Sequence, residues 1–173
     1  MKRSVALLPL AIVACVPASR PPAPAPKPVA AAPAPPPPPA PALGPDWRDW
    51  PLTPGTWSYR RDARGSVALF GEVNADARLT LRCDLSERRV YLSVAGGAAS
   101  QATLRTTSAT RQLALQPTGG ALPYAAAALT PSDPLLDALA FSRGRFTVER
   151  AGQPPLVAPA YPEVARVTED CRG

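Results

Sequence analysis

The sequence predicts a mainly β (α+β) fold: a small antiparallel sheet, arranged as a sandwich or a barrel, with two short helices near the C-terminus. Three observations lead to this fold class. After Gly44, short segments alternate apolar and polar residues with a period of two, which is typical of strands that bury one face. Turn-forming pairs such as Arg64-Gly65 and Gly119-Gly120 separate several of these segments. Closer to the C-terminus, two stretches instead have the spacing of amphipathic helices.

The strands are expected one after another from residue 67 onward, with a late strand between the two helical stretches. Strands that are short, closely spaced and joined by tight turns favour antiparallel pairing in a sandwich or a small barrel. The residues expected to face the core are Val67 and Leu69; Ala77, Leu79, Leu81 and Cys83; Val90, Leu92 and Val94; Ala102 and Leu104; Leu113 and Leu115; and Phe146 and Val148.

Two proline-initiated segments predict the helices. Asp133 can cap a helix with Pro134 at its first position, where the missing N–H has no role, and Gly144 offers a stop. A second helix is expected to begin at Pro162. The apolar stripes are Leu135, Leu136 and Leu139 on the first helix, and Val164, Val167 and Cys171 on the second.

Proline and aromatic residues divide the chain by composition. Fourteen of the 25 prolines lie between residues 16 and 45, and all ten aromatic residues lie beyond residue 46. A packed core depends on such large side chains, so only the later part of the chain can form one. The expected organisation is a signal peptide at 1–14, a lipidated cysteine with a Pro/Ala-rich disordered linker at 15–45, and a β-rich globular domain at 46–173.

The first residues have the order of an export signal. Lys2 and Arg3 precede an apolar run that is too short to span a bilayer. The run ends in Ile12-Val13-Ala14-Cys15, which resembles the lipobox of bacterial lipoproteins. That resemblance implies that Cys15 carries diacylglycerol and further acyl chains such as palmitate, which anchor the protein to a membrane. The alternative is an ordinary signal peptidase site at which Cys15 is incidental.

The same resemblance implies a location. A lipoprotein of this kind is held in the cell envelope by its lipid and faces the periplasm. Val16 follows the cysteine where an Asp would favour retention in the inner membrane, so the sorting pattern favours the outer membrane. The membrane, reached through the lipid anchor, is therefore the first expected partner.

The net charge argues against a nucleic-acid partner. The formal charge is +6, but Lys2, Arg3, Arg20 and Lys27 lie before the domain, so 19 minus 4 leaves 15 arginines against 13 carboxylates, or +2. The two signs are interspersed, and no basic stripe forms. We therefore expect no nucleic-acid binding.

Several catalytic classes lack their residues. The chain has no histidine, which excludes Ser-His-Asp and Cys-His catalysis, and no Gly-rich phosphate loop. No cofactor and no metal site are expected. Paired carboxylates could serve a cell-wall glycan hydrolase, although helix capping and solvated faces are the favoured interpretation. The carboxylates concerned are Asp133 and Asp137 on the first helix, and Glu163, Glu169 and Asp170 on the second.

Two other features have competing interpretations. Arg143 and Arg145 flank Gly144 and form a candidate anion-binding turn, because two guanidiniums can clamp a carboxylate or phosphate. The structural interpretation, favoured here, is that Gly144 caps the helix and arginine is favourable near a helix C-terminus. Trp47, Trp50 and Trp57 could form a sugar-stacking surface, but packing is the favoured role.

The cysteines predict one disulfide. With Cys15 assigned to lipid, Cys83 and Cys171 remain in an oxidising compartment, and both are expected to point inward. A bridge between them would fasten the last helix to the sheet and contribute up to about 4 kcal/mol. Two buried free thiols are the alternative.

The C-terminal part carries a second resemblance. The stretch from Asp133 to Cys171, with DPLLDALAFSRGRFTVE and PEVARVTEDC, is similar to a group of uncharacterised alphaproteobacterial envelope proteins, many of them predicted lipoproteins. The resemblance implies compartment and lineage, without an activity. The leading hypothesis is a non-catalytic binding or structural domain whose partner is an envelope protein or peptidoglycan. A cell-wall hydrolase and a lysozyme-inhibitor-like protein are the alternatives.

Overall fold

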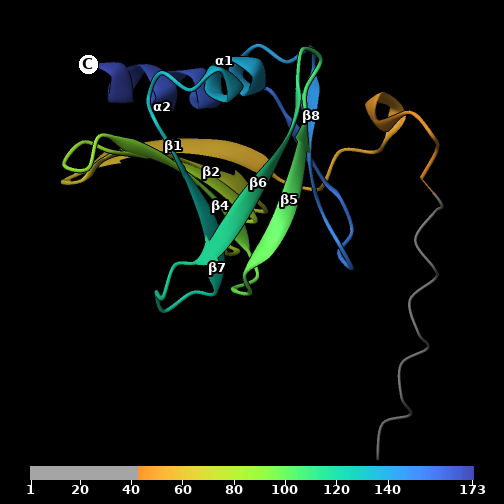
Figure 1. The fold of residues 1–173 in the computed structure, drawn as a ribbon, viewed down its shortest axis with the longest axis horizontal. Coiled ribbons are helices and arrows are strands. Elements are labelled where there is room, and N and C mark those ends of the chain that lie inside the picture. The colour runs from red at the N-terminus through yellow and green to blue at the C-terminus, as the bar shows by residue number, and fades with distance from the viewer. Residues whose placement is uncertain (1–42) are drawn as a thin grey trace, which may run out of the picture. The chain divides into compact units, whose positions relative to one another are not determined.

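The computed structural model describes residues 43–173 and confirms a mainly β fold. Nine strands form one antiparallel sheet in the order β1-β2-β3-β4-β7-β6-β5-β8-β9, which does not close into a barrel (Figure 1). The strands are β1 (Thr56–Asp62), β2 (Gly65–Gly71), β3 (Leu79–Asp84), β4 (Arg89–Ala95), β5 (Ser100–Arg105), β6 (Thr110–Pro117), β7 (Tyr124–Leu129), β8 (Arg145–Arg150) and β9 (Leu156–Pro159). The helices are the short 3₁₀ helix η1 (Trp47–Asp49), α1 (Pro134–Ala140) and α2 (Pro162–Arg172).

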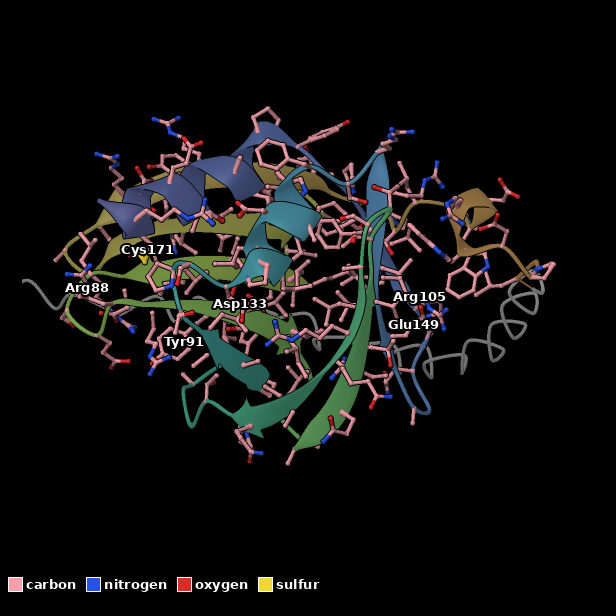
Figure 2. All side chains as sticks on the ribbon, turned by 45° about the horizontal axis from the view of Figure 1, so that its top comes forward. Arg88, Tyr91, Arg105, Asp133, Glu149 and Cys171 are labelled. Atoms are coloured by element: carbon pink, nitrogen blue, oxygen red, sulfur yellow. A yellow bond between two sulfur atoms is a disulfide. The ribbon has the colours of Figure 1, made fainter. Side chains whose placement is uncertain are left out.

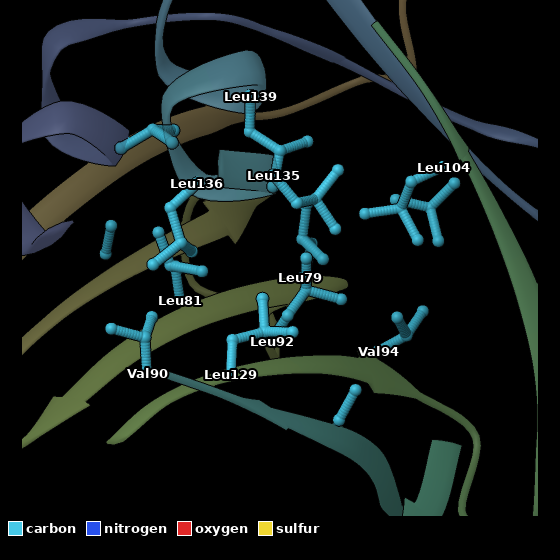
Figure 3. Close-up of a cluster of buried hydrophobic side chains, with 14 of the residues drawn as sticks. Leu79, Leu81, Val90, Leu92, Val94, Leu104, Leu129, Leu135, Leu136 and Leu139 are labelled. Carbon is cyan, nitrogen blue, oxygen red and sulfur yellow. The ribbon is translucent and has the colours of Figure 1, made fainter. Parts of the chain in front are cut away.

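Both α-helices lie on the same face of the sheet, here called the inner face (Figure 1). Helix α2 packs against β2 and β3, and α1 packs against α2. Between helices and strands, the leucines of α1 meet leucines and valines of β3 and β4 (Figure 3). Burial of this apolar surface is the main stabilising term of such a fold.

The other face, here called the outer face, is covered unevenly. The segment that contains η1 lies over β8, where Arg145 donates a hydrogen bond to the carbonyl oxygen of Trp50. Thr147 of β8 and Val157 of β9 are consequently buried although they alternate with the inner residues. Across β3, β4 and β7, by contrast, the outer face is open enough to hold the groove described below.

The edge strands β1 and β9 approach each other without forming a ladder. Just before β1, the backbone N–H of Thr53 donates a hydrogen bond to the carbonyl oxygen of Val157 at 2.9 Å. The hydroxyl oxygen of Thr53 in turn accepts a hydrogen bond from the backbone N–H of Val157. The indole of Trp57 donates to the carbonyl of Pro159 at 2.8 Å. These contacts limit the exposure of the two sheet edges, which would otherwise offer unpaired backbone groups.

The prediction for β2 was wrong in its phase. Ala68 and Phe70 point into the core, whereas Val67 and Leu69 lie on the outer face. Pairing with β3 decides this, because Ala68 lies opposite the inner residue Leu81. Nearly every residue of β2 is apolar or small, so its own alternation does not identify the inner face. Val67 is nevertheless buried, at 2% exposed, although it lies on the outer face opposite Arg82. The remaining residues expected in the core are also buried: Ala77, Leu79, Leu81, Cys83, Val90, Leu92, Val94, Ala102, Leu104, Leu113, Leu115, Phe146 and Val148.

Both helices begin where the sequence predicts. The side chain of Asp133 accepts the backbone N–H of Leu135 at 2.9 Å and caps α1. Helix α1 ends earlier than expected, because Phe141 occupies the C-cap and Gly144 lies in the following turn with a φ of +79°. Gly144 therefore does not cap the helix, and its positive φ serves the turn into β8. The predicted apolar residues of both helices are buried.

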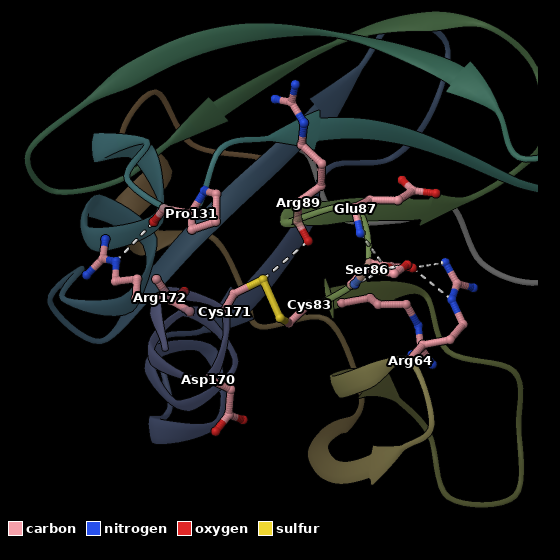
Figure 4. The surroundings of a disulfide bond; sticks show 12 residues. Arg64, Cys83, Ser86, Glu87, Arg89, Pro131, Asp170, Cys171 and Arg172 are labelled. Carbon is pink, nitrogen blue, oxygen red and sulfur yellow. Dashed lines mark hydrogen bonds and ion pairs between the residues drawn. A yellow bond between two sulfur atoms is a disulfide. The ribbon is translucent and has the colours of Figure 1, made fainter.

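A disulfide joins Cys83 of β3 to Cys171 of α2, as predicted (Figure 4). The two Cα atoms are 5.3 Å apart, and the bridge connects residues 88 positions apart in the chain. Both cysteines are buried where α2 faces the sheet. The bond therefore fastens the C-terminal helix α2 to strand β3. Within residues 43–173, no helix is long and apolar enough to cross a membrane.

Candidate functional site: a groove on the outer face

A groove of about 610 Å³ lies on the outer face of the sheet. Its volume falls within the range of about 300–1,000 Å³ that is usual for ligand sites. The residues that line it come from the β1–β2 turn, from β3, β4, β6 and β7, and from the β6–β7 connection. They are Arg64, Thr80, Arg82, Tyr91, Ser93, Ala114, Gln116, Pro117, Thr118, Tyr124, Ala126, Ala127 and Ala128.

The floor of the groove is a row of mostly small side chains. Strand register places Thr80 opposite Ser93, Ser93 opposite Ala126, and Ala126 opposite Gln116. Neighbouring strands are about 4.8 Å apart, so these four positions extend roughly 15 Å across the sheet. Because three of the four side chains are short, the sheet is hollow along this row. The hydroxyls and the amide of the row provide hydrogen-bonding groups.

Two tyrosines border the floor, one on each side. Tyr91 precedes Ser93 by two residues on β4, and Figure 2 shows its side chain on the face away from the helices. Its hydroxyl donates a hydrogen bond to Glu87, which raises the pKa of the Tyr91 phenol. On the other side, Tyr124 donates to the carbonyl of Ala77 at 2.5 Å, and burial raises the pKa of its phenol. Both rings are thus tethered and uncharged at neutral pH.

The two guanidiniums at the groove are neutralised by carboxylates. Arg82 donates two hydrogen bonds to Asp62, at 3.0 and 2.8 Å, and this pairing lowers the pKa of Asp62 to about 2. Arg64 donates two hydrogen bonds to Asp84, at 2.9 and 2.6 Å (Figure 4). Hydrogen bonds from the hydroxyl of Ser86 and from Arg64 hold the pKa of Asp84 well below its ordinary value. This side of the groove therefore combines four charges that sum to zero.

Such an arrangement suits recognition of an uncharged ligand. It presents tethered aromatic rings, hydroxyls and methyl groups, while its charged groups are already engaged with one another. Over residues 43–173, no group of three or more His, Cys, Asp or Glu side chains is arranged to hold a metal ion. The lining can contact a ligand through its shape and its hydrogen-bonding groups.

The turn that contains Arg143 and Arg145 is held by contacts within the chain. Ser142 donates its hydroxyl to the carbonyl of Arg145 at 2.5 Å and accepts the backbone N–H of Thr107 at 3.1 Å. The Arg145 guanidinium donates to the carbonyl of Trp50, whereas Arg143 is exposed. The two arginines thus differ in environment, and an anion-binding role for the pair stays a prediction.

The carboxylates considered for a hydrolase lie outside the groove. Asp133 also caps α1. Burial by itself raises the pKa of Asp170, but hydrogen bonds from Tyr59 and Arg61 outweigh it, so the pKa is lowered. Among the residues that the structure describes, one oxygen of Glu163 is buried without a hydrogen-bond partner. Three of the carboxylates form ion pairs: Asp133 with Arg111, Asp137 with Arg172, and Asp170 with Arg61.

The tryptophans are packing residues to a large extent. Trp57 is buried in the core, with its ring centroid 5.3 Å from that of Phe70. Trp47 is buried within η1, and the indole of Trp50 donates to the carbonyl of Gly44 at 2.7 Å. The favoured interpretation of the sequence matches these contacts.

Cys15 and the expected signal peptide lie outside the described residues, so lipidation and location stay predictions. The groove itself was not predicted. Its floor depends on β4 lying beside β7. The paired residues of these two strands are 29 to 39 positions apart in the chain, and β5 and β6 lie between them in sequence. The only local signal was a set of small residues between the apolar positions.

No protein-family model matches the chain, and no curated protein or solved structure matches it either.

Proposed function

We propose that this chain is an envelope lipoprotein, anchored to a membrane through Cys15, whose domain at 46–173 binds another envelope component in the outer-face groove without catalysing a reaction. The observation that carries the proposal is the floor of the groove, where Thr80, Ser93 and Ala126 form a hollow between two tethered tyrosines. Export and anchoring rest on the resemblance of residues 12–15 to a lipobox.

The composition of the lining supports binding over a purely structural role. A sheet face that meets only water does not need a hollow of small side chains bordered by tyrosine and arginine. Tyrosine and arginine are also the residue types enriched at protein interfaces and at binding hot spots. Rigid borders reduce the entropy lost when a ligand binds, because the tyrosines are already fixed by Glu87 and Ala77.

Site-specific photo-crosslinking in cells tests the groove. A photoreactive amino acid replaces Gln116 in the groove, and a matched control replaces Gln101, an exposed glutamine on β5 outside the groove. We expect one recurrent envelope component to be captured from position 116 and not from position 101. Equal capture from both positions, or no capture from position 116, would remove the groove as the binding site.

The lipid anchor is tested separately. In the Cys15→Ser variant, incorporation of radioactive palmitate and recovery in the membrane fraction are both expected to be lost. The matched control is Cys83→Ser, which breaks the disulfide but leaves Cys15, and it should retain both signals. Palmitate labelling that persists without Cys15 contradicts the anchor.

A further inference from the structure

The polar side chains on the floor of the outer-face groove have no partners inside the chain. Within residues 43–173, the side chains of Thr80, Ser93 and Gln116 make no hydrogen bond. Ser93 is only 8% exposed, and it is one of the residues that line the groove. Polar groups at such a depth are normally hydrogen-bonded, so water or a ligand in the groove has to complete them.

The main chain beneath the groove is already used by the sheet. Strand β3 pairs with β2 on one side and with β4 on the other, and β4 pairs with β3 and β7. Ala126 of β7 likewise lies between Ser93 and Gln116 in the ladders. A peptide that adds as a strand needs an unpaired edge, which the floor does not offer. A ligand on the floor is therefore recognised through side chains.

These side chains both donate and accept hydrogen bonds. The hydroxyls of Thr80 and Ser93 and the amide of Gln116 have both capacities. The border adds the pair of Arg82 with Asp62, which uses two of the five N–H groups of the guanidinium and leaves lone pairs on the carboxylate. A ligand hydroxyl, itself a donor and an acceptor, can pair with any of these groups. A charged group would lose its hydration without gaining a counter-ion, because the guanidiniums already have theirs.

Tyr91 and Tyr124 add aromatic surface on opposite sides of the floor. Tyr91 comes two residues before Ser93, and Tyr124 comes two residues before Ala126. Because β4 and β7 are antiparallel, these positions lie on opposite sides of the Ser93–Ala126 pair, about 14 Å apart along the strands at 3.4 Å per residue. The face of an aromatic ring is partially negative and attracts weakly positive C–H groups. The groove thus suits a ligand that presents both hydroxyls and C–H groups.

We propose that the ligand of the groove is a neutral oligosaccharide, with hydroxyls on the floor and the C–H groups of its sugar rings against Tyr91 and Tyr124. This inference rests on the proposed binding function and specifies the ligand. The floor extends roughly 15 Å across the sheet, which is longer than one sugar ring and suits a short chain of them. A lipid acyl chain in the same place would leave the hydroxyls of Thr80 and Ser93 without partners, at a cost in free energy.

The test uses the full-length chain in a detergent without sugar head groups, and isothermal titration calorimetry measures binding. The neutral probes are chitotetraose and cellotetraose, and the charged probe is de-N-acetylated chitotetraose, which has the same length and carries amino groups. We expect at least one neutral tetrasaccharide to bind saturably, and the charged one to bind at least tenfold more weakly than the better neutral one. If neither neutral probe binds at millimolar concentration, the inference is overturned. Equal binding of the charged probe would overturn the requirement for a neutral ligand.

A matched pair of glutamines on β6 tests the contribution of the floor. Gln116 lines the groove, whereas Gln112 is exposed on the same strand and lies outside the lining. Gln116→Leu removes one hydrogen-bonding group and should lower the affinity about threefold to tenfold. Gln112→Leu should bind as the natural chain does. Equal affinity in the two variants would contradict the site.

Two variants at Tyr91 test the aromatic border. Tyr91→Leu removes the ring and should lower the affinity about threefold to tenfold. Tyr91→Phe keeps the ring, loses only the hydroxyl, and should bind nearly as the natural chain does. Circular dichroism verifies that both variants are folded. An equal loss of affinity in the two variants would contradict contact between the ring and the sugar.

The outcomes separate this inference from the function on which it rests. If neither neutral tetrasaccharide binds while crosslinking at position 116 captures one envelope protein, the binding function stands and the oligosaccharide is overturned as its ligand. If position 116 captures nothing and neither tetrasaccharide binds, both proposals fail.

Discussion

The two faces of the sheet are made of alternate residues of the same strands, yet they differ in the size, packing and charge of their side chains. On β4, Leu92 points inward and is 1% exposed, whereas its neighbour Ser93 faces the groove. The inner face is packed with large apolar side chains beneath two helices and a disulfide. The outer face around the groove has small side chains, tethered tyrosines and paired charges. The difference suggests that the stability of the fold comes from the inner face, which leaves the outer face free to be shaped for a ligand.

Truncation on the two faces should separate them most strongly. Leu92→Ala leaves a cavity in the core and should lower the free energy of unfolding by about 2–5 kcal/mol. Ser93→Ala, its neighbour on the groove side, removes only a hydroxyl and should change it by less than about 1 kcal/mol. Urea unfolding followed by circular dichroism measures both. Similar decreases in the free energy of unfolding of the two variants would show that the outer face also contributes to the stability of the fold.

Removal of the disulfide should have the next largest effect. Replacing Cys83 and Cys171 together by alanine frees a loop that spans most of the domain, and the expected loss is about 2–4 kcal/mol. Hydrogen exchange should rise first in α2, which the bond fastens to β3. The control is the natural chain with its disulfide reduced, which should lose a similar amount. A reduced chain as stable as the oxidised one contradicts a stabilising role for the bond.

The sequence predicts those features of the two faces that depend on residues close together in the chain, and it misses those that depend on distant residues. The inner positions of β3 and β4 were predicted correctly, because Leu79, Leu81 and Leu92 alternate with polar or small neighbours. The phase of β2 was not, since a run such as Val67 to Phe70 is apolar throughout and pairing alone orients it. Both helix starts were predicted, because caps and prolines act within a few residues.

Three strands and the groove were missed for related reasons. β7 reads Tyr-Ala-Ala-Ala-Ala-Leu, and alanine has a stronger preference for helix than for strand. Its six pairs with β4 override that preference. β1 and β9 are edge strands whose partners and closing contacts lie far away in the chain. The groove requires the neighbours of β4 and β7 to be known, and no local pattern specifies them.

Acid titration should distinguish the two carboxylates that pair with the arginines of the groove. Asp84 is 2% exposed and accepts hydrogen bonds from Arg64, Ser86 and Glu87, so its pKa is lowered on folding. A lowered pKa stabilises the fold above the unfolded value of about 4, and the contribution is lost as the pH falls through the folded pKa. Asp84→Asn should therefore lower stability at pH 7 by about 1–3 kcal/mol and flatten its decrease in acid.

The matched control is Asp62→Asn. The side chain of Asp62 is 37% exposed, and its pKa is lowered to about 2 by Arg82. Solvent screens such an exposed pair, so the loss at pH 7 should be smaller than for Asp84→Asn. Urea midpoints between pH 2 and pH 7 measure both variants. A larger effect at Asp62 than at Asp84 would contradict the difference in burial on which the prediction depends.

The smallest effects are expected where η1 covers the outer face, at the turn that contains Arg143 and Arg145. Arg145→Gln removes the hydrogen bond to the carbonyl of Trp50 and should cost about 0.5–1.5 kcal/mol, whereas Arg143→Gln at an exposed position should change stability by less than about 0.5 kcal/mol. Thermal unfolding measures the difference, and titration with inorganic phosphate tests the predicted anion site in the same samples. If Arg143→Gln weakens phosphate binding without changing stability, the turn binds anions through its exposed arginine. If phosphate does not bind the natural chain, the predicted anion site is contradicted, and the two arginines serve the turn.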